Sequence, residues 1–316
     1  MSTYGGSVRI KCVAQQGQRS CTTACSLHIL QQSPQVPSFL AYFEQNTKSI
    51  AWGISSSQAE VMEAIQQWLQ GSSLDVLYAS FDFIDRDKRK LLDIQRSVLS
   101  ETPLLGSSLQ IELKENREWS ALWFRGETRA VMVDGSFTEA HFSWDQTSLF
   151  RWKVNDPTIL AALIRSWVSD DAAPSQMRIK FPWLVIGKLA DYYERGNPVE
   201  GEFLQSWDDA ERFIGNEQMQ FPQRTAVLNL LEVFRKAGYD KIFRAGVPGK
   251  SLLLSRSRRH GLRADLKCIQ FSFAAGEGTM DVFPNVTGAE RIVGIPIALS
   301  KQVEQAVLQL ADQPID

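Results

Sequence analysis

Residues 109–154 constrain the fold more than any other segment, because five short apolar runs follow one another there at close spacing. The runs are LQIEL, SALWF, RAVMVDG, HFSW and LFRWKV, with KENRE, RGET and DGSFTEA among the polar segments that separate them. Apolar runs of strand length with turn signals between them are typical of consecutive hairpins. The pattern therefore predicts an antiparallel meander of four or five strands.

Helical patterns flank this meander on both sides. Before it, Ser57 and Glu60 form a capping box ahead of an apolar stripe, which predicts the start of a helix. Residues 85–100 then show the spacing of a second amphipathic helix. After the meander, Asp156 followed by Pro157 is typical of a helix start, and we expect that helix to continue to about residue 168.

Three segments near the N-terminus complete the predicted first half. Residues 7–14 alternate between apolar and polar positions, which predicts a short strand. Residues 20–32 are compact and are followed by prolines, which predicts a helix that ends before them. Residues 74–84 combine β-branched and aromatic side chains, and we expect a strand there. Together these elements predict helices packed on one sheet.

The second half repeats this composition without repeating the sequence. Helices are predicted within residues 181–237, most clearly at 225–237, where Val227, Leu230, Leu231 and Phe234 form one stripe. Hairpins are predicted within residues 242–283, and a terminal helix at 301–311.

These patterns predict an α+β fold of two packed domains, residues 1–170 and 171–316, each with helices against a mainly antiparallel sheet. The length of 316 residues agrees, because domains usually hold about 100–200 residues. A formal net charge of -2 supplies no global field for nucleic acid or an anionic membrane. The sequence has neither a signal-peptide pattern nor an apolar stretch of about 18 residues, so we expect a cytoplasmic protein without a membrane partner.

The four cysteines allow several interpretations. Cys12, Cys21, Cys25 and Cys268 are too few for a disulfide framework, and we expect them to be reduced and mostly buried. In a helix, Cys21, Cys25 and His28 would share one face, and Cys12 could complete a tetrahedral zinc site. The favoured interpretation is core cysteines, with no metal and no cofactor.

A further alternative makes Cys25 a nucleophile. Gln18 precedes Cys25 by seven residues, and a cysteine at a helix N-terminus has a stabilised thiolate. A glutamine followed by a cysteine ahead of a helix resembles the arrangement in papain-type peptidases. The resemblance implies a cysteine-dependent enzyme in which Gln18 lines the oxyanion hole, with His141 as the base and Asp145 orienting it.

Basic side chains gather in the second half, at Arg244, Lys250, Arg256, Arg258, Arg259, His260 and Arg263. If residues 252–260 continue as one strand, alternate basic residues share an exposed face, and replacing Arg256 and Arg258 would leave the fold intact. Guanidinium groups suit carboxylate or phosphate partners. The alternatives are a solvated hairpin, an acidic protein surface and nucleic acid.

The predicted function is that of a non-enzymatic binding or regulatory protein that acts through a protein partner with an acidic surface. Its basis is three histidines, no complete catalytic signature, and nine Trp with seventeen Phe, which favour large contact surfaces. Nucleic-acid binding by residues 256–263 and a cysteine-dependent enzyme centred on Cys25 remain the alternatives.

Overall fold

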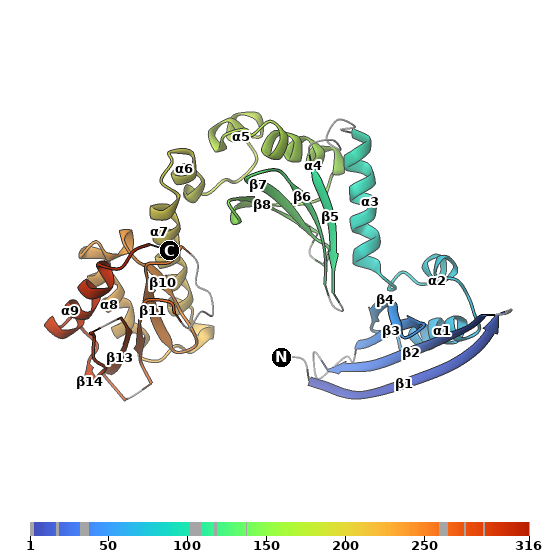
Figure 1. The fold of residues 1–316 in the computed structure, drawn as a ribbon, viewed down its shortest axis with the longest axis horizontal. Coiled ribbons are helices and arrows are strands. Elements are labelled where there is room, and N and C mark those ends of the chain that lie inside the picture. The colour runs from blue at the N-terminus through green and yellow to red at the C-terminus, as the bar shows by residue number, and fades with distance from the viewer. Residues whose placement is uncertain are drawn as a thin grey trace. The chain divides into compact units, whose positions relative to one another are not determined.

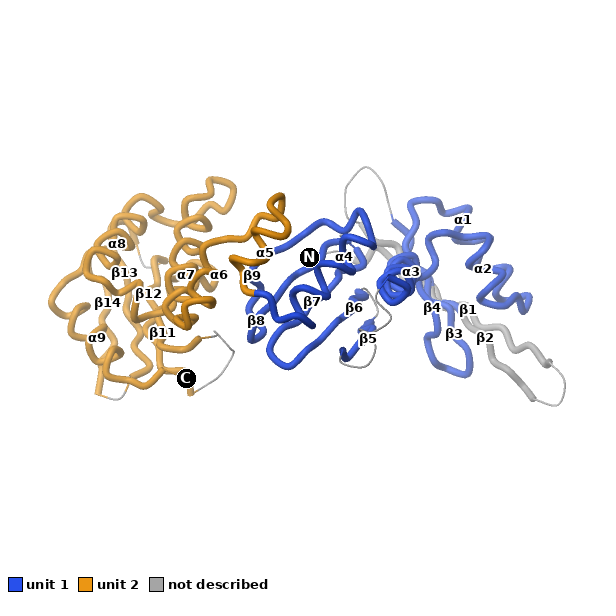
Figure 2. The backbone as a smooth tube through the Cα atoms, turned by 90° about the horizontal axis from the view of Figure 1, so that it is seen from above, with its two compact units in different colours: residues 1–172 blue, residues 173–316 orange. Residues whose placement is uncertain are grey.

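A computed structural model of the chain describes residues 3–16, 19–31, 38–101, 109–116, 119–136, 138–258, 265–274, 276–286 and 288–315. The backbone divides into two compact units, residues 1–172 and 173–316 (Figure 2).

Unit 1 begins with a four-stranded antiparallel sheet in the order β1-β2-β3-β4 (Figure 1). Its strands are β1 (Thr3–Gln16), β2 (Arg19–Gln31), β3 (Ser38–Gln45) and β4 (Lys48–Ser55). Helices α1 (Gln58–Leu69) and α2 (Leu74–Ser80) follow, and α1 packs on the sheet. Trp68 of α1 contacts the ring of Phe43 edge-on in the shared core. The predicted burial of Trp68 is confirmed.

Two elements of this region differ from the prediction. Residues 20–32 were expected to be helical, but they form strand β2, because pairing with β1 and β3 outweighs the local preference. Residues 74–84 were expected to be a strand, but they begin with helix α2. The hydroxyl of Ser73 caps this helix by accepting a hydrogen bond from the backbone N–H of Val76 at 3.4 Å.

A second antiparallel sheet, in the order β5-β6-β7-β8-β9, confirms the predicted meander. Its strands are β5 (Gln110–Glu115), β6 (Ser120–Arg125), β7 (Arg129–Asp134), β8 (Glu139–Trp144) and β9 (Thr147–Lys153). Helix α3 (Arg86–Glu101), helix α4 (Pro157–Ile164) and the π-helical turn Arg165–Ser169 pack on one face of this sheet. The buried residues of that face include Leu122, Phe124, Val131 and Phe142. Unit 1 thus holds two sheets, where the sequence predicted one.

The predicted helix starts in unit 1 are confirmed by their caps. Ser57 accepts a hydrogen bond from the backbone N–H of Glu60 at 3.3 Å. Asp156 accepts one from the N–H of Thr158 at 2.8 Å, and Pro157 is the first residue of α4. These caps satisfy backbone donors that have no partner within the helix.

Unit 2 places helices before and after a five-stranded antiparallel sheet. The helices are α5 (Pro174–Lys180), α6 (Lys188–Glu194), α7 (Pro198–Gly215), α8 (Arg224–Lys236) and α9 (Lys301–Ala311). The strands, in spatial as well as chain order, are β10 (Arg244–Gly246), β11 (Ser251–Ser255), β12 (Cys268–Ser272), β13 (Thr279–Asn285) and β14 (Ile292–Pro296). The predicted hairpins account for four of these strands, and β14 lies beyond them.

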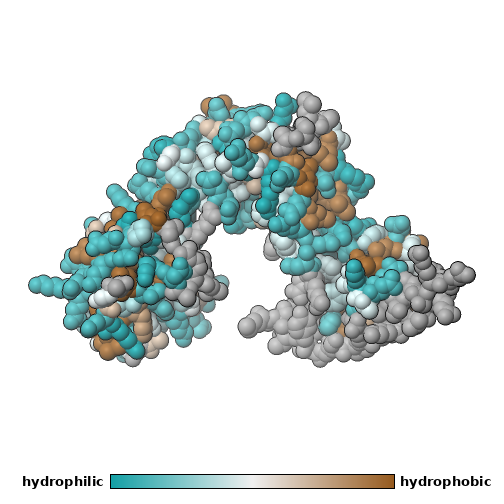
Figure 3. All heavy atoms as spheres, viewed as in Figure 1, coloured by the Kyte–Doolittle hydropathy of each residue, from teal (hydrophilic) through white to brown (hydrophobic). Residues whose placement is uncertain are grey.

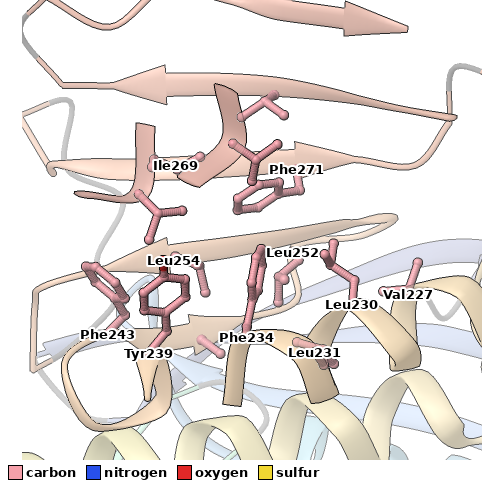
Figure 4. Packing of buried hydrophobic residues seen from close by; sticks show 14 of the residues in the cluster. Val227, Leu230, Leu231, Phe234, Tyr239, Phe243, Leu252, Leu254, Ile269 and Phe271 are labelled. Carbon is pink, nitrogen blue, oxygen red and sulfur yellow. The ribbon is translucent and has the colours of Figure 1, made fainter. Parts of the chain in front are cut away.

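Helix α8 supplies the centre of the core of unit 2 (Figure 4). Its apolar stripe, predicted from the sequence, points toward Leu252 and Leu254 of β11 and toward Phe271 of β12. Leu231 is fully buried in this cluster, as predicted. Such interlocking of a helix stripe with a sheet face is the main source of stability in α+β units.

The chain is therefore α+β. In the view of Figure 3, most of the described surface carries hydrophilic residues, with smaller hydrophobic groups between them. Among the described residues, no helix combines the length and the apolar character needed to cross a bilayer.

Candidate functional site

The sheet of β5–β9 has a second face, opposite to the helices, that carries a row of large polar and aromatic side chains. Strand pairing aligns Glu112, Trp123, Met132, His141 and Arg151 as direct neighbours across all five strands. Successive side chains of a strand point to opposite faces. Since Leu122 and Phe124 are buried on the helix-covered face, Trp123 lies on the open one.

A hollow of about 500 Å³ lies on this open face and extends to the turns at one end of the sheet. Its lining includes Trp123, Arg125, Met132, His141 and Ser143 from the strands. Ligand sites in proteins commonly measure about 300–1,000 Å³ and combine apolar surface with a few polar groups. The size and lining of this hollow fit that description.

Trp123 and Arg125 form a stacked pair in the hollow. The guanidinium carbon of Arg125 lies 4.3 Å from the centroid of the Trp123 ring, and the Nζ of Lys114 lies 6.0 Å from it. The Nε1 of Trp123 and the Nε of Arg125 are both buried, and neither has a hydrogen-bond acceptor in the described part of the chain. A buried donor without an acceptor costs roughly 1–3 kcal/mol, so these two N–H groups favour an added acceptor.

Basic groups outnumber accessible carboxylates on the open face. Its basic residues are Lys114, Arg125, Arg151 and Lys153. Glu112 is shared by Lys114 at 3.5 Å and Arg125 at 4.0 Å. Glu139 in the same way contacts Arg151 at 3.8 Å.

A third carboxylate of the face, Asp134, is largely buried and accepts hydrogen bonds from the indole of Trp119 and the N–H of Ser136. The strands of the face therefore carry more accessible basic groups than accessible carboxylates. Two further carboxylates, Glu127 and Asp145, lie in the turns at one end of the hollow.

His141 contacts Glu139, with 3.2 Å between Nε2 and Oε2. Burial, and then the charge of Arg151, lower the pKa of His141, so the ring is neutral at pH 7. Asp145, which was predicted to orient His141, lines the same hollow from the turn between β8 and β9. It has a left-handed backbone with φ 46°, as does the next residue, Gln146, with φ 69°, as two-residue hairpin turns require.

Arg129 fixes the turn end of the hollow. Its guanidinium lies between the rings of Trp144 and Trp167, 4.2 and 4.3 Å from their centroids. Its Nε forms an ion pair with Asp171 at 2.8 Å, and it donates a hydrogen bond to the carbonyl of Ala172. These contacts tie the sheet to the segment after α4 and hold the wall of the hollow in place.

The structure does not bring the predicted enzyme residues together. Cys25 belongs to β2 in the other sheet of unit 1, within its hydrophobic cluster, whereas His141 and Asp145 line the hollow on the second sheet. Burial, with a smaller contribution from Glu44, raises the pKa of the Cys25 thiol to about 12. The thiol is therefore protonated at neutral pH. Gln18 lies outside the described residues.

Cys25 should consequently resist alkylation in the folded protein. The thiolate is the reactive form, and a pKa of about 12 leaves only a trace of it at pH 8. We expect iodoacetamide to label Cys25 at least 100-fold more slowly in native protein than in urea, as measured by peptide mass spectrometry. Rapid native labelling of Cys25 at pH 7 would restore the hypothesis of a cysteine-dependent enzyme.

The predicted helical face of the alternative zinc site does not form, because Cys21, Cys25 and His28 lie on strand β2. Residues an odd number apart in a strand face opposite sides, so Cys25 and His28 of β2 cannot share a face. Cys12 lies on β1, where it pairs with Thr23, midway between Cys21 and Cys25 of β2, so a metal role for these three cysteines stays a prediction. Within the described residues, no group of three or more His, Cys, Asp or Glu side chains is arranged to hold a metal ion.

The predicted basic face in unit 2 differs from its expected form. Strand β11 ends at Ser255, so Arg256 and Arg258 do not continue it. Arg256 donates a hydrogen bond to the carbonyl of Ala311 in α9 at 2.8 Å. Arg258 contacts both carboxylate oxygens of the buried Glu202, at 2.8 and 3.2 Å.

The other members of that basic set have separate positions. Arg244 on β10 donates to the backbone carbonyl of Arg258, and Lys250 lies exposed in the turn before β11. Arg259, His260 and Arg263 lie outside the described residues. A binding role for this set stays a prediction. Within the set, Arg258 already forms an ion pair with Glu202.

Trp123 and Arg125 were missed as site residues because they lie in a predicted strand without a known motif. Their spacing of two residues in SALWFR was the available signal, since it places both on one face of a strand. Which face is open depends on α3 and α4, and no local pattern shows that.

Comparisons with protein-family models, with curated proteins and with solved structures find no match for this chain. The geometry of the hollow is therefore the basis for a functional proposal.

Proposed function

We propose that this chain is a non-enzymatic binding protein of the cytoplasm that acts through a protein partner, and that the open face of β5–β9 is its contact surface. The observation that carries the proposal is the stacked pair of Trp123 and Arg125 in the hollow, with two buried N–H groups that have no acceptor in the described part of the chain. Trp and Arg are among the residues most enriched at the centres of protein interfaces.

The charge of the open face supports an acidic partner. On the strands of this face, four basic side chains stand beside two accessible carboxylates, Glu112 and Glu139, and a partner rich in Asp and Glu would balance that surplus. Glu127 and Asp145 lie outside the strands, in the turns. A cytoplasmic setting is supported by Cys25 and Cys268, which are free thiols, because disulfides are rare in that compartment.

Truncating Trp123 should weaken the binding of the partner. We expect Trp123→Ala to weaken the complex by about 30-fold or more, the size of a loss of roughly 2 kcal/mol at an interface hot spot. A photoreactive amino acid at Met132, in the middle of the open face, should crosslink the partner in otherwise unchanged protein. Trp123→Ala should abolish that crosslink.

Trp183→Ala is the matched control, because Trp183 lies in unit 2 and is 48% exposed. This variant should crosslink the partner from Met132 as unchanged protein does. A photoreactive group at Val233, an exposed position of α8, should give no specific product. Equal crosslinking from Met132 with and without the Trp123 ring would contradict the proposal.

A further inference from the structure

Around Arg125, the hollow on the open face has more hydrogen-bond donors than acceptors. The Nε of Arg125 and the Nε1 of Trp123 are unsatisfied in the described part of the chain, and the Nη2 of Arg125 reaches only Glu112, at 4.0 Å. The Arg125 side chain is 36% exposed, so it can turn toward a ligand without disturbing the helix-covered core.

The geometry points to a carboxylate-binding site, in which a side-chain or terminal carboxylate of the partner accepts hydrogen bonds from Arg125 and from the indole N–H of Trp123. This inference rests on the proposed function and names the group that the partner must present. A guanidinium offers a planar fork of donors that matches the two oxygens of a carboxylate. The indole adds a donor that cannot accept.

The basic groups nearest to the Trp123 ring are Arg125 and Lys114. Arg125 is the last residue of β6, and Glu127 follows in the turn between β6 and β7, whereas Asp145 lies in the turn between β8 and β9. His141 is neutral at pH 7 and contacts Glu139. Arg125 therefore brings the positive charge to the place where the two donors lack acceptors in the described part of the chain.

A nucleic-acid base fits the same place less well. Base recognition on a sheet uses the open face of an aromatic ring for stacking. Here the guanidinium of Arg125 lies over the Trp123 ring at 4.3 Å. A base would have to displace this cation, whereas a carboxylate gains from it.

The experiment follows the indole N–H resonance of Trp123 in full-length ¹⁵N-labelled protein, assigned with Trp123→Phe. The probe is a blocked peptide of alternating Glu and Gly, compared with its Gln and Gly counterpart. We expect a saturable shift of this resonance with the Glu peptide alone, weakened by added salt. Arg125→Lys, which keeps the charge but loses the fork, should weaken binding at least tenfold.

Arg212→Lys is the matched control, because Arg212 lies on α7 in an exposed ion pair with Asp209; it should bind the Glu peptide as unchanged protein does. Equal shifts from both peptides, no shift from either, or unchanged binding by Arg125→Lys would each overturn the inference. So would a shift caused by single-stranded oligouridylate and not by the Glu peptide.

The outcome is separable from that of the proposed function. A Trp123-dependent crosslink from Met132, combined with no response to the Glu peptide, would remove only the carboxylate assignment and leave the contact surface. If crosslinking from Met132 did not depend on Trp123, the proposal that this face is the contact surface would be rejected.

Discussion

Replacing Arg258 with alanine should destabilise unit 2 by about 2–4 kcal/mol, because breaking a buried ion pair costs roughly 3–5 kcal/mol and the Arg258 side chain is 30% exposed. Glu202, whose side chain is 3% exposed, would lose both hydrogen bonds from Arg258, and the hydroxyl of Tyr193 would still donate to its carboxylate. Hydrogen exchange of the amides of β10 and β11, followed across a urea series, measures this loss in unit 2 alone.

Arg258→Ala also tests whether Arg258 stabilises the fold or is only a solvated side chain. Glu202→Gln should also destabilise the unit, and Arg258→Ala combined with Glu202→Gln should cost less than the sum of the two, because both remove one interaction. Arg212→Ala, which breaks an exposed ion pair with Asp209, is the control and should cost under about 1 kcal/mol. If Arg258→Ala behaved like this control, the prediction from the sequence that these arginines leave the fold intact would be right.

The elements that the sequence predicted well are those whose signals are local. The helix starts at Ser57 and Asp156 each follow from a side-chain oxygen that accepts from backbone N–H groups two or three residues further on, one for Ser57 and two for Asp156. The meander of 109–154 needs only neighbouring strands to pair. The terminal helix α9, Lys301–Ala311, has the predicted bounds.

The elements predicted wrongly depend on contacts that the local pattern does not contain. Strand β2 is stabilised by β1 and β3 on its two sides, so its residues are extended although their local pattern predicts a helix. Hairpin β3–β4 does have a local signal, at its turn. Asn46 and Thr47 stand between two apolar runs, and both have left-handed backbones, with φ 51° and 67°, as a two-residue turn needs.

Two residues of the candidate site were predicted from the sequence, but as members of a different set. His141 and Asp145 were named as members of a catalytic set with Cys25, and the structure places them on the hollow without Cys25. Arg258 was assigned to a binding face, but its partner Glu202 is 56 residues away in the chain. A sequence shows which side chains can bind carboxylates, whereas the tertiary fold decides which of them are already occupied.

A second large loss of stability is expected in the core of unit 2, when Leu231 is replaced. Leu231 is fully buried on α8 and packs in the cluster shown in Figure 4. Leu231→Ala should lower the free energy of unfolding of this unit by about 2–5 kcal/mol, since it loses transfer free energy and leaves a cavity in a close-packed core. Alanine and leucine both favour helix, so the loss reports packing and not helix propensity. Hydrogen exchange of the α8 and β11 amides across a urea series measures it.

Trp68→Ala should show a loss of similar size in unit 1, because Trp68 is 4% exposed and contacts Phe43. Each core variant has a control on its own helix. Val233 of α8 is 42% exposed and Met62 of α1 is 41% exposed, so replacing either with alanine should change stability by about 0.5 kcal/mol or less. Losses below about 0.5 kcal/mol for Leu231→Ala and Trp68→Ala as well would mean that the inward faces of α8 and α1 are assigned wrongly. A large loss in the core variants with none in the controls would confirm both faces at once.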